Sequence, residues 1–302
     1  MILAIGEILF DMFPAGRRLG GAAFNFAYHI HQLAGPLRFL SRIGDDPEGQ
    51  DIERFLTAQH FPCDDLQRDA IHPTGQVRVA LDGRGSPQFE ILSGAAYDFI
   101  TPTPAITRYV AHDCRLIYFG SLIQRTAQGA RTMRAILQQR APHVKCLFDV
   151  NLRPDCYTDE ILTASLGETD LLKLSQEELD VLSAMQGLTG STTDRVAGLR
   201  ARFGIEMVAL TRGAQGSCLF TGDTRHDIQP GNNIAVKDTV GAGDAFAAML
   251  AIGYLRGWPS ARTLSLADRF ATAVCGIEGA VPTTPRFYEP FRQALSPGSD
   301  HE

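Results

Sequence analysis

A short segment in the last third of the chain, residues 238–244, combines glycines and acids in a pattern that suits phosphoryl chemistry. Its sequence is Asp-Thr-Val-Gly-Ala-Gly-Asp, and an apolar, alanine-rich run that predicts a helix follows it. Gly241, Ala242 and Gly243 form a turn that can curl freely, so several N–H groups at the helix start point to one spot. With the helix dipole, these groups form an anion site. Asp244 would repel a resting anion, but it suits a base that acts while charge develops.

Residues 238–244 do not match the other common glycine-rich phosphate motifs. A dinucleotide-binding fingerprint needs a third glycine three residues later, and its absence excludes an NAD-dependent oxidoreductase. A Walker A loop needs a Gly-Lys pair followed by serine or threonine, which is also missing. A simple strand-to-helix turn would not need two glycines around one alanine with acids at both ends. Phosphoryl transfer to a hydroxyl group is therefore the favoured interpretation.

Two further segments carry polar side chains where a ligand could bind. Gly20 and Gly21 precede an expected helix that contains Asn25, and Asp11 lies upstream; aspartate and asparagine suit hydrogen bonds to sugar hydroxyls. In the second segment, Asp149, Asn151 and Arg153 follow an expected buried strand, and strand alternation places them on one side. Ligands of open α/β sheets bind at the carboxyl ends of strands. The alternative is a polar loop in which Asp149 pairs with Arg153.

Two more polar segments have a structural explanation as well as a functional one. Ser175 and Glu178 have the spacing of a capping box, in which the two side chains cap the start of a helix. The segment from Thr211 through Gly213 to Gly216 is also compatible with a plain turn between two strands.

The overall composition limits the class of protein. The chain has 302 residues, of which 44% are hydrophobic, and this is enough for a full core. A formal charge of -6 argues against a nucleic-acid binder, and no apolar run is long enough to span a membrane. Six scattered cysteines without a paired motif indicate free thiols in a reducing compartment, so we expect a cytoplasmic protein.

Hydrophobic patterning predicts a doubly wound, mostly parallel sheet with helices on both faces. Short, solidly apolar runs indicate strands buried on both faces, and they alternate with helical stretches. The expected strands cover residues 2–10, 37–43, 115–119, 144–150, 171–174, 206–210 and 217–220. The expected helices cover residues 25–33, 50–60, 127–139, 177–185, 193–202, 242–256 and 260–277. This order is typical of the α/β class.

One segment differs from this pattern. Residues 76–81 and 88–92 alternate polar and apolar side chains around a turn at Asp82, Gly83, Arg84 and Gly85. Such alternation indicates a hairpin with one wet face, so we expect it in a small second sheet outside the main body.

Two parts of the chain, residues 238–244 and residues 20–49, resemble the signatures of a known family. Residues 238–244 resemble the C-terminal signature of the ribokinase-like (PfkB) family of carbohydrate kinases. Residues 20–25, followed by residues 42–49, resemble its N-terminal signature. The resemblance covers nearly the whole chain, from Gly6 to about Pro285. It implies one kinase domain over residues 1–302, with a β lid formed mainly by residues 11–18 and 73–97.

The resemblance also implies roles for individual residues. Asp244 matches the catalytic base that takes a proton from the attacking sugar hydroxyl, and Gly241, Ala242 and Gly243 match the anion hole. At Ser175 the chain departs from the usual asparagine of the family, as fructokinase-like members often do. The remaining expected site residues are Asp11, Gly21, Asn25, Arg153 and Asp149 for the sugar, Thr211, Gly213, Gly216, Ser175 and Asn151 for the nucleotide, and Glu178 for Mg²⁺ through water.

Within the family, three features resemble fructokinases: the Gly6-Glu7 pair, the spacing of Asp149, Asn151 and Arg153, and the Lys173-Leu174-Ser175 run. They imply transfer of the γ-phosphate of ATP to D-fructose, giving fructose 6-phosphate. A 2-keto-3-deoxygluconate kinase is the first alternative, because Arg153 suits that substrate's carboxylate; ribokinase and nucleoside kinase follow.

The alternative from another functional class is a regulator that binds a sugar or a nucleotide without catalysis. The intact base and anion hole disfavour it. The expected ligands are a small sugar, ATP and Mg²⁺, with activation by a monovalent cation such as K⁺ left open. We expect no nucleic-acid or membrane partner, and either a monomer or a homodimer.

Overall fold

The main body of the protein is a nine-stranded sheet. The computed structural model describes residues 1–14, 16–81, 87–229 and 235–296, so the expected turn at residues 82–85 lies outside the described residues. The strand order is β13-β12-β11-β10-β9-β8-β1-β4-β5, and every neighbouring pair from β11 to β5 is parallel. Its strands are β1 (Ile2–Ile5), β4 (Arg38–Gly44), β5 (Leu66–Asp69), β8 (Leu116–Gly120), β9 (Lys145–Asp149), β10 (Leu171–Ser175), β11 (Met207–Thr211), β12 (Ser217–Thr221) and β13 (Thr224–Ile228).

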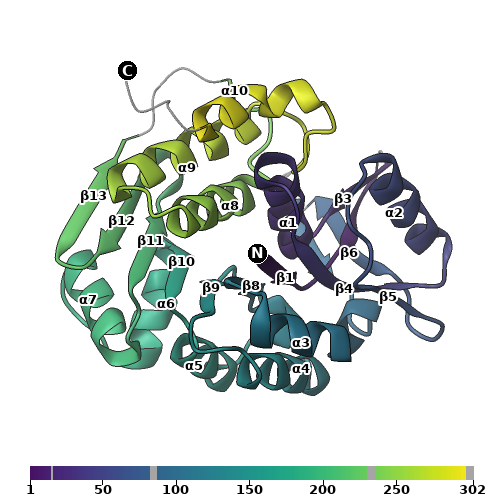
Figure 1. Cartoon of the computed structure of the whole chain (residues 1–302), viewed down its shortest axis with the longest axis horizontal. Coiled ribbons are helices and arrows are strands. Elements are labelled where there is room, and N and C mark those ends of the chain that lie inside the picture. Colours follow the sequence, from purple (N-terminus) through teal and green to yellow (C-terminus); the bar gives the residue numbers. More distant parts are fainter. Residues whose placement is uncertain (15, 82–86, 230–234, 297–302) are drawn as a thin grey trace.

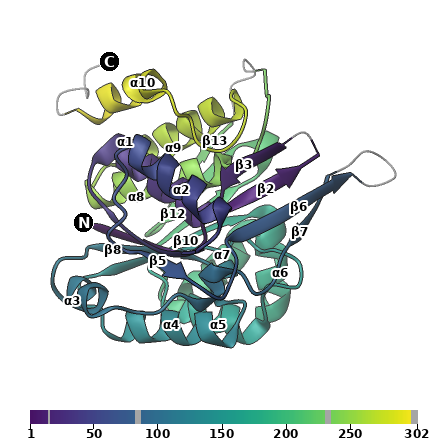
Figure 2. The ribbon, with the colours of Figure 1, turned by 90° about the vertical axis from the view of Figure 1, so that its right-hand side faces the viewer.

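Helices cover both faces of this sheet, as Figures 1 and 2 show. One face carries α1 (Ala22–Ala34), α2 (Pro47–Ala58), α8 (Ala242–Leu255), α9 (Ser260–Cys275) and α10 (Pro285–Leu295). The other carries α3 (Pro104–His112), α4 (Ala127–Gln138), α5 (Asp159–Gly167), α6 (Gln176–Gln186) and α7 (Thr192–Phe203). Side chains alternate between the two cores along β1, where Ile2 and Ala4 face one core and Leu3 and Ile5 the other. The doubly wound α/β fold is thereby confirmed.

A small second sheet projects from one side of the body (Figure 2). Its order is β3-β2-β6-β7. The strands are β2 (Leu9–Phe13), β3 (Gly16–Gly20), β6 (Gly75–Leu81) and β7 (Pro87–Ile91). The expected hairpin strands near residues 76–81 and 88–92 are therefore present and lie outside the main sheet, as predicted.

The single strand predicted over residues 2–10 is wrong. The structure divides this stretch into β1 of the main sheet and the start of β2 of the small sheet. Gly6 allows the break, because its φ of 151° and its missing side chain let the chain turn past Ala23. A Cβ atom at Gly6 would lie 2.6 Å from the Cβ of Ala23.

Several elements escaped the sequence patterns. β5 and β13 are edge strands, and both carry charged side chains that hide an apolar signal. β12 and β13 also run antiparallel to their neighbours, which simple strand–helix alternation does not predict. The helices α3, α5 and α10 were not predicted either; they have nine, nine and 11 residues.

Two smaller observations bear on the expected class of protein. All six cysteines are free, as their scattered spacing predicted. Within the described ranges, no helix combines the length and the apolarity that crossing a membrane requires.

The order of the strands fixes where a ligand can bind. The chain moves from β1 to β4 in one direction along the sheet and from β8 to β13 in the other, and β1 and β8 are neighbours. Such a switch point opens a crevice at the carboxyl ends of the strands. The segments after β1, β8 and β9 therefore converge there.

Candidate active site

The central contact of the site joins the first turns of two helices. Asn25 lies in the first turn of α1 and Asp244 in the first turn of α8, and both side chains are buried. The Asn25 amide donates from Nδ2 to Oδ2 of Asp244 over 2.7 Å. The Oδ1 atom of Asn25 is also buried, and no hydrogen-bond partner for it occurs within the described residues. Asn25 therefore orients Asp244 and keeps one acceptor for a ligand.

The surroundings of Asp244 act on its pKa in both directions. Burial raises the pKa, because it removes water from the charged form. The hydrogen bond from Asn25 and the positive charges of Lys173 and Arg153 lower it, while the charge of Glu7 raises it again. The net shift is upward from the ordinary value of an aspartate. A buried carboxyl with a raised pKa is well matched to accept a proton.

The turn before Asp244 depends on its two glycines. Gly241 has a φ of 82°, in the left-handed region, and a Cβ atom there would lie 2.5 Å from the Cβ of Ala280. A Cβ atom at Gly243 would lie 2.9 Å from Nζ of Lys173. In the part of the chain that the structure describes, no side chain caps the start of α8. Ala242 N–H donates to the Thr239 carbonyl over a long 3.3 Å, whereas no acceptor for the N–H groups of Gly241 and Gly243 occurs within the described residues, so these two remain available to an anion.

Lys173 belongs to the run that resembles fructokinases, but the sequence assigned no role to its side chain. It lies on β10 with a buried side chain, and its Nζ donates to Oδ1 of Asp149 over 2.9 Å. Tyr118 on β8 donates from its hydroxyl to Oδ2 of the same carboxylate over 3.2 Å. A lysine between apolar neighbours in an expected buried strand was a signal that its side chain needs a buried partner.

These contacts correct two predictions about Asp149. Its side chain has no exposed surface and both oxygens have protein partners, so it lies beneath the site and does not line it. Its ion-pair partner is Lys173 and not Arg153. The expected alternation along residues 149–153 fails because Asn151 has a φ of 39°, which ends the extended conformation of β9. Burial raises the pKa of Asp149 to about 6, against the opposing effect of Lys173.

A small cavity at the sheet switch point brings several predicted residues together. Asn151 and Arg153, from the segment after β9, both line it. They face the first turn of α1, at whose N-terminal boundary Gly21 stands. The full lining consists of Glu7, Ala22, Ala23, Tyr118, Gly120, Ser121, Leu122, Asn151 and Arg153.

Glu7 is a second residue whose role was not evident from sequence. Its Oε1 accepts hydrogen bonds from the backbone N–H groups of Ala22, over 2.8 Å, and Ala23, over 3.4 Å. It thus caps α1 from 15 residues away, where a local capping pattern cannot reveal it. Burial raises its pKa, and these backbone hydrogen bonds partly oppose the shift.

Asp11 approaches the same region from the small sheet. It lies on β2, and burial raises its pKa to about 6. The charge of Arg153 opposes this shift, Asp238 adds to it, and Arg18 opposes it. Asp11, Arg153 and Asp238 thus lie within electrostatic reach of one another, although they belong to three different parts of the chain.

Of the predicted nucleotide residues, Asn151 lines the cavity described above, and the other four lie at or just after the carboxyl ends of β10 and β11. Ser175 and Thr211 are register partners at the ends of β10 and β11. Gly213 and Gly216 bound the single turn η3 (Gly213–Gln215) that follows β11. The capping box is present on α6, since Ser175 caps Glu178 N–H and Glu178 accepts from Ser175 N–H over 2.7 Å.

Glu178 has a second backbone partner. Its Oε1 accepts from Leu152 N–H over 2.8 Å, so this carboxylate joins α6 to the segment that carries Asn151 and Arg153. Each carboxylate oxygen can accept a further hydrogen bond, which leaves room for a water molecule. No group of three or more histidine, cysteine or acidic side chains that could hold a metal directly occurs among the residues described.

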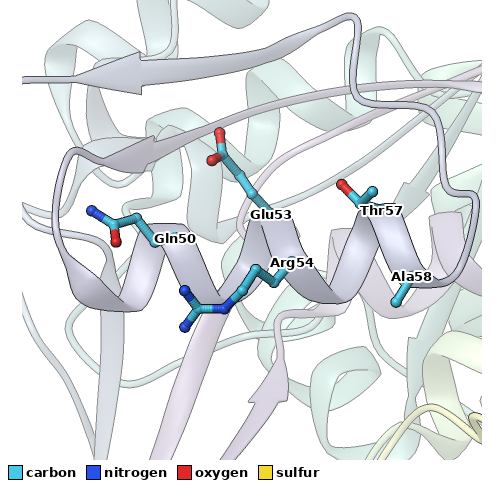
Figure 3. Close-up of a pocket in the computed structure, with 5 residues that line it drawn as sticks. All are labelled: Gln50, Glu53, Arg54, Thr57 and Ala58. Carbon is cyan, nitrogen blue, oxygen red and sulfur yellow. The ribbon is translucent and has the colours of Figure 1, made fainter.

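A larger surface hollow lies away from this site, on the outer side of α2 (Figure 3). Glu53 pairs there with Arg68, and Arg54 pairs with Asp51. None of the predicted site residues contributes to it. Its lining consists of Gln50, Glu53, Arg54, Thr57 and Ala58, all from one helix.

Comparison with known proteins agrees with this geometry. Residues 14–286 match the model of the pfkB family carbohydrate kinase. A fructokinase from Klebsiella pneumoniae is 29% identical over 291 residues, which cover 91% of this chain and 91% of that protein. Another, from Escherichia coli, is 29% identical over 307 residues, covering 94% and 96%.

Solved structures show the same fold. Fructokinase from Xylella fastidiosa with bound ATP superimposes with a TM-score of 0.81 at 21% identity, covering 98% of this chain and 99% of that one. Fructokinase from Vibrio cholerae with fructose, ADP and calcium gives 0.78 at 23% identity, covering 95% and 97%. Since the family model spans most of the chain, the protein belongs to the pfkB family of carbohydrate kinases, in its fructokinase-like subgroup.

Proposed function

We propose that this protein transfers the γ-phosphate of ATP to D-fructose and releases fructose 6-phosphate. The observation that carries the proposal is the contact between Asn25 and Asp244 beside the uncapped start of α8. It combines an oriented base with N–H groups that can hold a transferring phosphoryl group. The fructokinases among the relatives support fructose as the acceptor and ATP as the donor.

In the proposed reaction, the oxygen of the sugar hydroxyl attacks the γ-phosphorus while Asp244 accepts the proton of that hydroxyl. The bond from phosphorus to the bridging oxygen of ATP breaks, and ADP leaves with that electron pair. The N–H groups of Gly241, Ala242 and Gly243 stabilise the charge on the phosphoryl oxygens in transit. Asn25 keeps the carboxylate of Asp244 in place throughout.

We assign nucleotide binding to the carboxyl ends of β10 and β11 and to the turn η3 that follows β11. Thr211, Gly213 and Gly216 would border the nucleotide. Ser175 and Asn151 would lie nearer the transferred phosphate, since Asn151 also lines the cavity at the switch point. Glu178 would hold Mg²⁺ through water, because each of its oxygens keeps a free acceptor position beside its backbone partner. Mg²⁺ would supply positive charge to the phosphates. A monovalent cation such as K⁺ would act on rate without changing these roles.

For the sugar, we assign the cavity at the switch point and the small sheet above it. Asp11 and the free Oδ1 of Asn25 would accept hydrogen bonds from sugar hydroxyls, Gly21 would let the ring approach α1, and Arg153 would close the cavity. The small sheet would be the lid, formed mainly by residues 11–18 and 73–97 of the single domain. Lid closure would exclude water and limit ATP hydrolysis.

Charge favours a neutral sugar. The carboxyl groups of Glu7, Asp11 and Asp244 all interact electrostatically with the single guanidinium of Arg153. An anionic substrate would add another negative charge to this group, and like charges close together cost free energy. One observation favours 2-keto-3-deoxygluconate instead. Arg153 forms no ion pair within the described residues, so its guanidinium could bind the carboxylate of that substrate.

A phosphorylation screen tests the proposal. The protein is incubated with ATP, Mg²⁺ and separately fructose, 2-keto-3-deoxygluconate, ribose and a nucleoside, and ADP release is measured. We expect the highest kcat/KM with fructose, and Arg153→Ala should raise the KM for fructose. A preference for ketodeoxygluconate that Arg153→Ala abolishes would replace fructose by that acid. Binding of sugar without any ADP release would instead identify a non-catalytic regulator.

A further inference from the structure

One side chain of the small sheet reaches across to the segment that precedes α8. Arg18 lies on β3, and its Nη1 donates to Oδ2 of Asp238 over 3.2 Å. Its Nη2 donates to Glu278, on the loop after α9. Arg18 and Asp238 are 220 positions apart in sequence. This contact therefore joins the expected lid directly to the first residue of the Asp-Thr-Val-Gly-Ala-Gly-Asp segment.

Asp238 in turn determines the shape of the phosphate-binding turn. Its Oδ1 accepts from Val240 N–H over 3.1 Å, and its Oδ2 accepts from Gly279 N–H over 3.1 Å. The same loop brings Ala280 against Gly241, so close that a side chain at Gly241 would collide with it. One carboxylate thus ties the turn before α8 to the loop after α9. A side chain that binds this carboxylate acts on both.

Arg18 also stands beside the expected sugar contact. In the antiparallel pair of β2 and β3, Arg18 is the register partner of Asp11. Paired residues of neighbouring strands project from the same face of a sheet. Asp11 and Arg18 therefore project from the same face of the small sheet, and Arg18 reaches Asp238 from there. The charges of Arg18 and Asp238 both act on the Asp11 carboxyl, which agrees with this placement.

We propose that Arg18 is a positioning residue that couples sugar binding at Asp11 to the shape of the phosphate-binding turn through Asp238. The proposal rests on the proposed sugar kinase activity. When the sugar holds the small sheet against the body, Arg18 reaches Asp238 and Glu278 and orders the turn that receives the phosphoryl group. Without sugar, the sheet is free to move away and the turn loses this support. Nucleotide then binds more weakly until sugar is present.

The strength of the contact suits such a role. The side chains of Arg18 and Asp238 are 39% and 18% exposed, so water and salt weaken the ion pair. A weak, solvent-accessible pair can form and break in every catalytic cycle, whereas a fully buried one would hold the sheet closed. The guanidinium also packs on Phe13 of the same sheet, which holds Arg18 in the direction of Asp238.

The neighbouring arginine provides a matched control. Arg17 lies next to Arg18 on β3, but it pairs with Glu48 and Asp51 on α2. Like Arg18, it joins the small sheet to the body through two acids and packs on an aromatic ring, that of Phe10. It has no contact with Asp238. Arg17→Gln and Arg18→Gln should both weaken the attachment of the small sheet to the body. Only Arg18→Gln should weaken the coupling between sugar binding and nucleotide binding.

The test is the effect of sugar on nucleotide affinity. Calorimetry gives the Kd of a non-hydrolysable ATP analogue with Mg²⁺, with and without a saturating amount of the sugar that the screen identifies. In the wild-type protein we expect the sugar to lower this Kd by about 5-fold to 150-fold, the usual range of coupling between two sites. Arg18→Gln should reduce that factor to less than about a third of its wild-type value. Arg17→Gln should leave it unchanged, and Arg18→Lys should restore part of it.

Three results would show that Arg18 does not couple sugar binding to nucleotide affinity. They are an unchanged effect of sugar on the Kd of the ATP analogue in Arg18→Gln, an equal loss of that effect in Arg17→Gln, and no effect of sugar in the wild-type protein. Thermal unfolding of each variant separates the result from a loss of folding, since a merely structural role would lower Tm and leave the factor intact. If no sugar is phosphorylated at all, the proposed function fails first. Phosphorylation with an unchanged factor overturns this inference alone.

Discussion

The amide of Asn25 and the carboxylate of Asp244 are 219 positions apart in the sequence and 2.7 Å apart in the structure. Each lies in the first turn of its helix, so two helix N-termini meet at one carboxylate. Both helix dipoles favour negative charge there, and the Asn25 hydrogen bond favours it further. These effects offset part of the cost of burying Asp244. Asp244, the proposed base, is thus kept both buried and capable of ionising.

The first prediction concerns pH. Asn25→Ala removes the hydrogen bond that lowers the pKa of Asp244, so the pKa should rise further above its ordinary value. A base works only when deprotonated, so activity is lost as the pH falls through its pKa. The acid limb of the kcat–pH profile should therefore move to higher pH in the variant, with partial recovery at alkaline pH. A limb at the wild-type position would show that Asn25 does not influence the base.

The second prediction concerns the base itself. Asp244→Asn keeps the shape of the side chain and one oxygen that can accept from Asn25, but it cannot accept the proton of the hydroxyl. We expect kcat to fall by at least about 10², while the Kd for sugar changes little. Steady-state kinetics and calorimetry measure the two quantities. Turnover close to that of the wild-type protein would remove Asp244 from its assigned role.

The third prediction concerns the buried ion pair. Lys173→Met leaves the carboxylate of Asp149 without its charged partner in a fully buried position, which should cost about 3–5 kcal/mol of unfolding free energy. Lys173→Met combined with Asp149→Leu should lose less than the single variant, because no charge is then stranded. Urea denaturation measures both.

A surface lysine serves as the control for this pair. Lys145 bonds Asp170 and Glu206 where its side chain is 28% exposed, so Lys145→Met should cost no more than about 1 kcal/mol. Equal losses for the two lysine variants would mean that the burial of Lys173 and Asp149 has no special weight.

The fourth prediction separates two roles of Glu178. Glu178→Gln keeps one acceptor oxygen, which can still complete the capping box, but its NH₂ group cannot accept from the second backbone N–H group, and the negative charge is lost. The free energy of unfolding should therefore fall by about 1–3 kcal/mol, because one backbone N–H group loses its acceptor. The Mg²⁺ concentration for half-maximal activity should rise about 10-fold or more. The control is Asp194→Asn in the corresponding capping box of α7, which should leave the Mg²⁺ dependence unchanged. If Glu178 only caps α6, its substitution will not change that dependence either.

Local patterns in the sequence predicted much of the fold. Solid apolar runs gave most of the main strands, since a strand covered on both faces must be apolar along its whole length. The capping box at Ser175 and the turn at residues 238–244 were also visible, because their hydrogen bonds join residues within one or two turns. The break at Gly6 was missed because the clash that requires glycine there comes from Ala23, on another element.

By itself, the sequence determined the α/β class and pointed to residues 238–244 as a candidate anion-binding turn with Asp244 as the candidate base, because each of these depends on neighbouring residues. Only the tertiary structure decided the partners. It paired Lys173 with Asp149, placed Glu7 at the start of α1, and brought Arg18 to Asp238. These contacts depend on the order of the strands and on how the helices pack across them. No spacing along the chain encodes that order, because apolar strands of similar composition can be arranged in more than one way until their side chains pack.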